Sequence, residues 1–158
     1  MLIESTDLGK LRRILIEDSV LRNLRAFRQV DALATEAGGI LLGYRRDPHI
    51  HISAATGPGT NDRRSRFHFS REDPSHQRFA RSQWQRSART LDYVGEWHTH
   101  PEINPQPSHI DFEEWRRLSV SRADAMIFVI QGTERLWVGC GVGGAISKLE
   151  IFGESAPR

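Results

Sequence analysis

Two histidines, a serine and an aspartate follow one another closely in the chain, as His98-Thr99-His100 and then Ser108 and Asp111. On a strand, residues two apart point to the same side with Cα atoms about 6.5 Å apart, so His98 and His100 can hold one zinc ion. Asp111 is the predicted third ligand, with water in the fourth position. Three protein ligands plus water are typical of a catalytic zinc, whereas structural sites are usually closed by four ligands. The pattern therefore predicts a catalytic zinc site.

The connection between the histidines and the aspartate has the composition of a turn that leads into a helix. Pro101, Pro105 and Pro107 prevent the strand from continuing. Ser108 and Asp111 then share a face of the first helical turn, because residues three apart in a helix are neighbours. The same Ser-x-x-Asp spacing is also typical of a capping box that has no catalytic meaning. Taken alone, this spacing favours the capping box; combined with the histidines, it favours the metal site.

A glutamate followed by a glycine-rich strand entry, Glu36-Ala37-Gly38-Gly39-Ile40-Leu41-Leu42-Gly43, lies upstream of this pattern. Together the two segments resemble the JAMM signature of the JAB/MPN metallopeptidase family. The resemblance runs from about residue 11 to residue 152. It implies zinc-dependent hydrolysis of an amide or isopeptide bond. The residues that match the zinc ligands of the family are His98, His100 and Asp111, while Glu36 matches the general acid/base and Ser108 the residue that stabilises the oxyanion.

Glu96 is an alternative general base. It shares the parity of His98 and His100, so strand geometry puts all three side chains on one face. We expect Glu96 to orient a ligand or to pair with an arginine, and Glu36 to move the proton. The tryptophans Trp97 and Trp115 are expected to pack beneath the site.

Within the family, residues 95–102, the Pro-x-Pro-Ser-x-x-Asp segment, Trp115 and residues 56–59 are most similar to a bacterial branch found beside cyclic-oligonucleotide anti-phage systems. That similarity implies a protein substrate: an isopeptidase of this branch releases the conjugated C-terminus of a CD-NTase, the nucleotidyltransferase of such systems, from its target. Two alternatives stay open. One is a peptidase that trims sulfur-carrier or ubiquitin-like proteins, and the other is a catalytically inactive MPN scaffold that only binds partners.

The elements that must position these residues alternate between strands and helices. Strands are predicted over 11–16, 40–44, 49–55, 92–98, 125–130, 136–140 and 145–152, and a helix over 108–118. A second helix is predicted to start at Asp18 or Ser19 and to bury Phe27 and Val30. A third, starting at Asp73-Pro74, is predicted to bury Phe79, Ala80, Trp84, Ala88 and Leu91. This order predicts one mixed α/β domain over 1–158, a mixed sheet flanked by helices. The family resemblance implies a JAB/MPN-like fold with cytidine-deaminase-like layering.

Residues 56–73 are interpreted as a long, mobile surface segment with a short strand-like patch at 66–69. Arg63, Arg64 and Arg66 in this segment are expected to be solvated, or else to grip an acidic or extended substrate tail. His68 and His109 are placed in or beside the predicted cleft.

Composition excludes several functional classes. The apolar runs are too short for a membrane-spanning helix and no secretory signal follows Met1, so we expect no membrane association. Of 22 basic residues only Lys10 and Lys148 are lysines, but the 20 arginines are scattered and the net charge is +2, which argues against nucleic-acid binding. The single cysteine, Cys140, is expected to be core filler and fits a reducing, cytoplasmic setting. A second histidine pair, His49 and His51, is expected at the surface without a metal.

Overall fold

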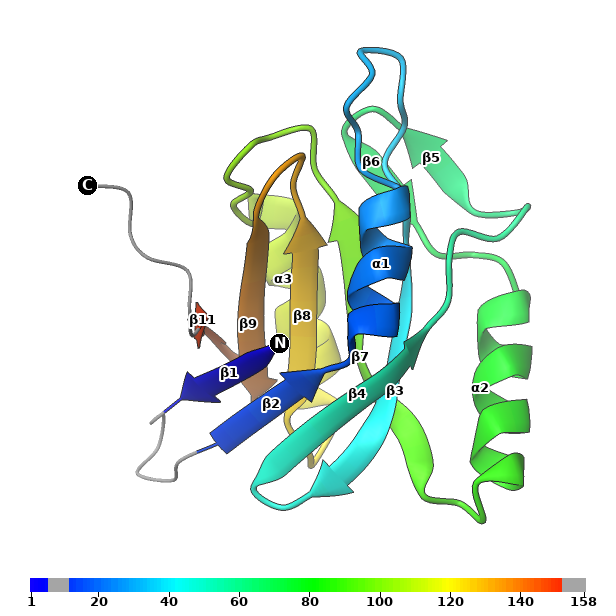
Figure 1. The fold of residues 1–158 in the computed structure, drawn as a ribbon, viewed down its shortest axis with the longest axis vertical. Coiled ribbons are helices and arrows are strands. Elements are labelled where there is room, and N and C mark those ends of the chain that lie inside the picture. Colours follow the sequence, from blue (N-terminus) through cyan, green and yellow to red (C-terminus); the bar gives the residue numbers. More distant parts are fainter. Residues whose placement is uncertain (6–11, 152–158) are drawn as a thin grey trace.

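One large mixed sheet organises the computed structural model, which describes residues 1–5 and 12–151 (Figure 1). Within these residues, nine strands have the order β10-β9-β8-β7-β3-β4-β2-β1-β11. Their bounds are β1 (Leu2–Ser5), β2 (Arg12–Ile16), β3 (Gly38–Arg46), β4 (His49–Ala55), β7 (Leu91–Thr99), β8 (Met126–Gln131), β9 (Leu136–Val142), β10 (Ala145–Lys148) and β11 (Glu150–Ile151). The pairs β2–β4 and β7–β8 are parallel and the other neighbouring pairs are antiparallel. Strands β5 (Arg63–Ser65) and β6 (His68–Ser70) form a separate hairpin.

Helices cover both faces of the sheet, which confirms the predicted mixed α/β class. The helices of the described residues are α1 (Asp18–Ala26), α2 (Ser75–Arg86) and α3 (His109–Val120). Strand β8 is buried on both faces, and its side chains alternate between two cores. Ile127 and Val129 belong to the core that includes α1, while Phe128 stacks on Trp115 of α3 with ring centroids 4.7 Å apart. Central strands therefore read as continuous apolar runs.

The two edges of the sheet come together. Strands β10 and β11 lie at opposite ends of the strand order, although Leu149 alone separates them in sequence. The Leu149 amide donates to the Val138 carbonyl of β9 at 2.9 Å, and Ile3 of β1 shares a core with Val138. The sheet therefore curls around the core that contains α1. The predicted single strand over 145–152 is broken at Leu149 by this turn, and Leu11 and Phe152, at the ends of two predicted strands, lie outside the described residues.

Two of the predicted helices differ from the structure. Helix α1 ends at Ala26 rather than near Val30, because Phe27 turns to pack on Trp97, with ring centroids 5.8 Å apart, and Val30 is 73% exposed. In α2, His76 is the buried residue, whereas the predicted core residues Phe79 and Trp84 are more than a third exposed. Ala80 packs against the sheet beside Leu91, which begins β7, so α2 touches the sheet over a small area.

The segment 56–73 contains more regular secondary structure than the sequence predicted. It contains the β5–β6 hairpin and is held by Asp62, which accepts hydrogen bonds from the Gly59, Glu72 and Asp73 amides at 2.6–2.8 Å. The buried His76 ring lies 2.8 Å from Asp62 and 2.6 Å from the Thr56 hydroxyl. A buried polar network thus replaces the expected irregular loop. None of the described helices is long and apolar enough to cross a bilayer.

Candidate metal centre

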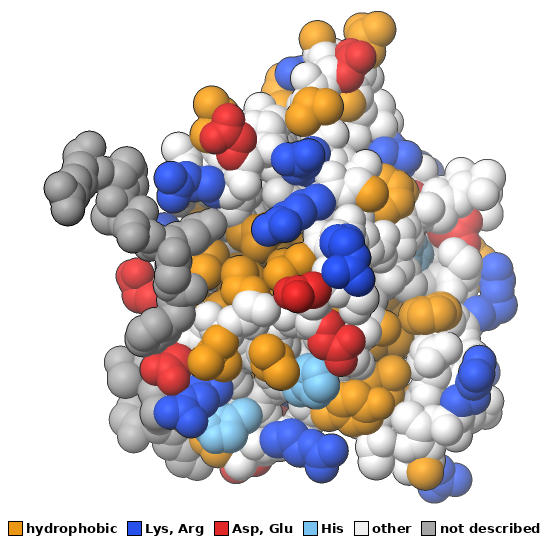
Figure 2. Space-filling model, in the orientation of Figure 1, with side chains coloured by type: hydrophobic (Ala, Val, Ile, Leu, Met, Phe, Trp, Pro, Cys, Tyr) orange, Lys and Arg blue, Asp and Glu red, His pale blue; other side chains and the backbone are white. Residues whose placement is uncertain are grey.

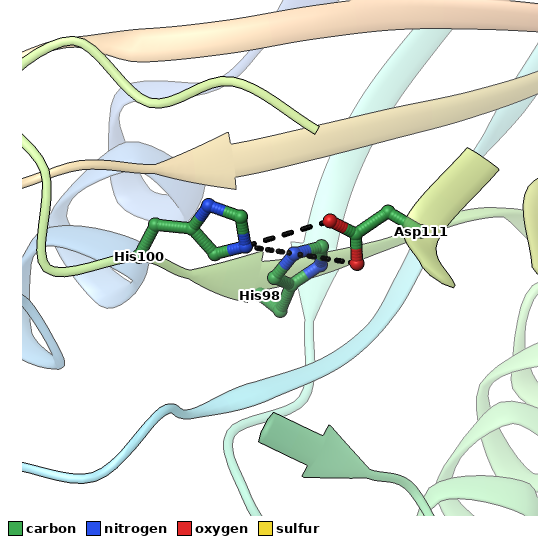
Figure 3. A group of neighbouring side chains, drawn as sticks. All are labelled: His98, His100 and Asp111. Carbon is green, nitrogen blue, oxygen red and sulfur yellow. Dashed lines mark hydrogen bonds and ion pairs between the residues drawn. The ribbon is translucent and has the colours of Figure 1, made fainter. Parts of the chain in front are cut away.

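The histidine pair and the aspartate converge at the end of β7 (Figure 3). His98 is the penultimate residue of β7, His100 follows its last residue, and Asp111 lies in the first turn of α3. The two Nε2 atoms are 3.0 Å apart, and Asp111 Oδ1 lies 3.3 Å from His98 Nε2. Asp111 Oδ2 lies 3.5 Å from His100 Nε2. Two imidazoles and one carboxylate from separate elements therefore point at one spot.

These separations can be compared with those of a tetrahedral zinc site. A tetrahedron with metal–ligand bonds of 2.0–2.2 Å has edges of about 3.3–3.6 Å. The two Nε2 atoms are somewhat closer than this, at 3.0 Å, and Asp111 approaches the two rings through different oxygens, Oδ1 at 3.3 Å from His98 and Oδ2 at 3.5 Å from His100. The side chains are between 10% and 15% exposed, which leaves one side open. The three residues, whose ligand atoms all lie within 4.8 Å of one another, could therefore hold a metal ion.

The capping box and the metal-site geometry occur together, although the sequence presented them as alternatives. Ser108 caps α3: its hydroxyl accepts from the Asp111 amide at 3.2 Å, and Asp111 Oδ2 accepts from the Ser108 amide at 2.6 Å. The cap fixes the carboxylate against the helix end and turns Oδ1 toward His98. The Ser108 hydroxyl is thus hydrogen-bonded within the cap and also lines the cleft.

Glu36 lies beside the same centre, although it precedes β3 and the histidines lie at the end of β7. Its Oε1 is 3.8 Å from His100 Nε2, and its side chain is 6% exposed. The register that pairs Gly38 with His98 brings the start of β3 to the end of β7. A methyl group on residue 38 would lie 2.5 Å from the Phe69 ring and 2.7 Å from the Trp97 carbonyl, so this close approach requires glycine.

The charges of the centre are strongly coupled. Burial, reinforced by the nearby Asp111 charge, raises the pKa of Glu36 to about 7 despite the opposing effect of His98. Burial also acts to raise the pKa of Asp111, but the hydrogen bond and charge of His98 and the Ser108 hydrogen bonds outweigh it and hold that pKa at about 2. Burial lowers the pKa of His100, and the neighbouring His98 lowers it further. Asp111 is thus ionised at neutral pH, as a metal ligand must be.

Glu96 occupies the position expected for a residue paired with an arginine. Its Oε1 accepts a hydrogen bond from Arg71 at 2.6 Å and another from the Tyr93 hydroxyl at 2.8 Å. These two hydrogen bonds hold the carboxylate between Arg71 and Tyr93. Among the described residues, Glu36 lies within ion-pair distance of His100, a predicted metal-binding histidine, whereas Glu96 pairs with Arg71.

The centre opens into a cleft of about 490 Å³. The β5–β6 hairpin borders it through residues 67–71, and α3 borders it through Ile110, Glu114 and Leu118. His68 lines the cleft, whereas His109 is 84% exposed and does not line it. Trp115 packs beneath the centre, with its ring centroid 5.9 Å from that of His98.

Of the other residues singled out in the sequence, Cys140 is buried in the core. Trp97 is buried and lines the cleft, and its indole donates to the Thr56 carbonyl. Arg64 and Arg66 are not simply solvated: both donate to backbone carbonyls of residues 31–36. Lys and Arg side chains on the face in Figure 2 are dispersed among acidic and apolar ones.

Two buried polar residues that sequence reasoning missed support the centre from behind. Thr99, between the histidines, accepts the Ala37 amide at 2.9 Å and donates to Gln29 Oε1 at 2.9 Å, while its own amide donates to the Ala37 carbonyl at 2.8 Å. Gln29 also donates to the Ala34 and Arg66 carbonyls. Strand alternation predicts that Thr99 points to the face opposite the histidines. No sequence pattern indicated a role for Gln29.

Comparison with known proteins gives a consistent family assignment. A family profile described as prokaryotic homologues of the JAB domain matches residues 17–139. Three curated proteins named "CD-NTase/cGAS isopeptidase" are similar over most of the chain. The Pseudomonas aeruginosa protein is 40% identical, covering 84% of this chain and 87% of its own. The Escherichia coli protein is 36% identical, covering 87% of each chain, and the Vibrio cholerae protein is 38% identical, covering 80% of each.

A solved structure supports the same fold. The solution structure of a protein from Desulfitobacterium hafniense superposes with a TM-score of 0.61. The alignment covers 85% of this chain and 88% of the other, at 21% sequence identity. At this identity, the likeness concerns the fold alone.

Proposed function

The chain belongs to the prokaryotic JAB-domain family, and from that premise we propose that it is a zinc-dependent isopeptidase. Its proposed substrate is the amide bond that joins the C-terminus of a CD-NTase to a target protein, so that cleavage reverses a ubiquitin-like conjugation in anti-phage defence. The names of the three similar proteins support the substrate class. The convergence of His98, His100 and Asp111, with Glu36 3.8 Å from His100, is the observation that carries the proposed chemistry.

His98, His100 and Asp111 are the proposed zinc ligands, and the proposal is supported by their ligand atoms lying within 4.8 Å of one another. When bound, zinc supplies a Lewis acid that polarises the scissile carbonyl and makes water more acidic. Trp115, which is stacked on Phe128, packs against the His98 ring and shields one side of it from water. The open side faces the cleft, where a scissile bond would enter.

Glu36 is the proposed general base and acid. Its carboxylate takes a proton from the attacking water and later delivers it to the amine that leaves, so the carboxylate is regenerated after each turnover. A base works best when its pKa is near the working pH, and burial raises the pKa of Glu36 to about 7. Its fixed position beside His100 keeps the carboxylate near the reacting groups.

Ser108 is the proposed donor to the oxyanion. The hydroxyl lines the cleft beside the metal centre, and its oxygen already accepts the Asp111 amide. A hydrogen bond from this hydroxyl to the developing negative charge stabilises the tetrahedral transition state more than the planar amide. One serine would then cap the helix that carries a ligand and assist the reaction.

The shape of the cleft agrees with a peptide substrate. The cleft runs between the β5–β6 hairpin and α3, with the metal centre at its floor. Phe67 and Phe69 offer apolar contacts on one wall, and Ile110 and Leu118 offer them on the other. A narrow, extended C-terminal tail fits between two such walls, while the folded body of the substrate stays outside.

Incubation with a conjugate tests this proposal. The substrates are a CD-NTase, a sulfur-carrier protein and a ubiquitin-like protein, each joined through its C-terminus to a reporter. We expect cleavage of the CD-NTase conjugate directly after its last native residue, as measured by mass spectrometry, and loss of cleavage after chelation with recovery on adding zinc. Cleavage of the sulfur-carrier or ubiquitin-like conjugate alone would favour the trimming peptidase.

Protein that is purified without chelator, contains zinc and cleaves none of the conjugates would contradict the hydrolase proposal. Less than about half an equivalent of zinc in such a preparation would favour the MPN scaffold. The Glu36→Gln protein is the control for contaminating peptidases, because it is expected to keep zinc and lose turnover.

A further inference from the structure

The backbone of Glu36 is held by the β5–β6 hairpin. The Glu36 amide donates to the Ser65 carbonyl at 2.7 Å, and the Glu36 carbonyl accepts from Arg64 Nε at 2.6 Å. A second guanidinium nitrogen of Arg64 lies 3.4 Å from the Thr35 carbonyl. Both backbone polar groups of the proposed base are thus bound by two consecutive residues of β5.

The opposite side of the same short loop is fixed to the histidine strand. Ala37 exchanges hydrogen bonds with Thr99 through its amide and its carbonyl. The chain around Glu36 is therefore clamped between β7, which carries the proposed ligands, and β5, which carries Arg64. Removal of either clamp frees the backbone on which the Glu36 carboxylate depends for its position.

Arg64 is not required to fill the core. The residue is exposed, as are Arg63 and Ser65 beside it in β5. Its bond to the Glu36 carbonyl is therefore a local constraint that can be removed without leaving a cavity. Arg63 offers a matched comparison, because it is the preceding residue, its side chain is 78% exposed and its partner is Glu72 at 3.1 Å.

The other strand of the hairpin faces the cleft. Phe69 and Ser70 of β6 and Phe67 at the turn line the cleft, and the Phe69 ring packs directly on Gly38. The β5–β6 pairing joins Arg64 to Phe69 in register. A single hairpin thus contacts the proposed base with one strand and the substrate space with the other.

We propose that Arg64 is a positioning residue for the general base, because it holds the backbone from which the Glu36 carboxylate reaches His100. This inference rests on the proposed function of Glu36. Arg64, together with the Ser65 carbonyl, keeps the Glu36 backbone in place. The rate of proton transfer falls steeply when a catalytic group is misplaced by about 1 Å.

The test compares Arg64→Ala, Arg64→Lys and Arg63→Ala with wild type. Arg64→Ala is expected to lower kcat about 10- to 100-fold, with KM changed less than about threefold and zinc content unchanged. Arg64→Lys keeps one donor for the Glu36 carbonyl and should recover part of kcat. Arg63→Ala should match wild type in kcat, which separates the bond to Glu36 from a general effect of charge.

A second measurement does not depend on activity. Hydrogen exchange of the Glu36 amide, followed by NMR or in a peptide spanning 33–38, is expected to quicken in Arg64→Ala but not in Arg63→Ala. Unchanged exchange and unchanged kcat in Arg64→Ala would overturn the positioning role while wild type still cleaves. If wild type cleaves nothing, the proposed function fails, and the exchange measurement alone decides whether Arg64 holds the loop.

Discussion

The chain carries two His-x-His pairs beside opposite ends of β3 in one sheet, and they are built differently. His98 and His100 at the end of β7 bring their Nε2 atoms to 3.0 Å, with Asp111 within 3.5 Å of each. On β4, His51 pairs with Glu17 at 2.9 Å, while His49 Nδ1 accepts the Arg13 amide of the adjacent β2. The first pair shares a carboxylate, and in the second pair each histidine has a partner of its own.

The difference shows what strand spacing does and does not provide. Alternation puts both imidazoles of each pair on one side of a strand. A chelating site also needs a third donor that reaches both rings and an environment that leaves their nitrogens free of other bonds. Helix α3 supplies that donor through its capped first turn at the end of β7. The β4 pair lies beside β2, whose amide and following glutamate occupy the rings separately.

The largest difference between the two histidine pairs is expected in zinc content and turnover when the carboxylate beside each pair is replaced. Asp111→Asn keeps an oxygen for the capping box but removes the anionic ligand, so zinc binding should fail and turnover should fall by at least about 10⁴-fold. Glu17→Gln makes the same change at the β4 pair and should leave zinc content and turnover unchanged. Zinc analysis after dialysis and conjugate cleavage provide the measurements. Stoichiometric zinc in Asp111→Asn would contradict the ligand assignment.

The two glutamates near the β7 histidines, Glu36 and Glu96, are expected to differ in their effect on turnover. Glu36→Gln removes the proton carrier and should lower turnover about 10²- to 10⁴-fold with zinc retained. Glu96→Gln alters the pairing with Arg71 and Tyr93 and should cost less than about tenfold. The measurement is kcat at saturating substrate together with zinc content. The assignment is wrong if Glu36→Gln turns over normally while Glu96→Gln is inactive.

Ser108 should show both of its roles. Ser108→Ala loses the hydroxyl donor and the cap, so turnover should fall about 10²-fold and the free energy of unfolding by about 1 kcal/mol. Ser108→Gly loses the donor but preserves most of the cap, since glycine is tolerated at N-caps at a cost of a few tenths of a kcal/mol. Equal turnover but unequal stability of the two variants is the expected result. Turnover near wild type in Ser108→Gly would exclude the oxyanion role.

The pKa of Glu36 should appear in the stability of the metal-free protein. Because the folded pKa, about 7, lies above the usual value of 4.5, the folded state binds this proton more tightly than the unfolded state. The contribution is fully present below pH 4.5 and is lost as pH rises through about 7. Denaturant titrations of zinc-free wild type and Glu36→Gln should therefore show the variant gaining relative stability across this window. A pH-independent difference would contradict the raised pKa.

The smallest effect is expected at the β4 pair. His51→Ala removes a half-exposed ion pair with Glu17, and His49→Ala removes an acceptor for one backbone amide at an exposed position. Each should change the free energy of unfolding by about 1 kcal/mol or less. Thermal denaturation and zinc analysis check this expectation. Loss of zinc in either variant would mean that the two pairs are not distinct.

Much of the fold was predictable from local pattern. The buried strands β3, β4, β7, β8 and β9 and the start of α3 at Ser108 follow from apolar runs, turn residues and the cap. The end of α1 was not predictable, because Phe27 leaves the helix to pack on Trp97, seventy residues later in the chain. Trp84 and Phe79 were predicted to be buried by α2 but remain more than a third exposed, since α2 touches the sheet over little area.

For the site, the sequence by itself determined the local part. The two-residue spacing of His98 and His100 and the Ser108–Asp111 cap are set within one strand and one helical turn, where covalent geometry fixes the outcome. The position of Glu36 beside His100 depends on the β3–β7 register. The contact of Arg64 with the Glu36 backbone depends on the position of the hairpin. Those contacts join residues far apart in the chain. Only packing of the whole sheet decides which distant backbone groups meet, so only the tertiary structure revealed them.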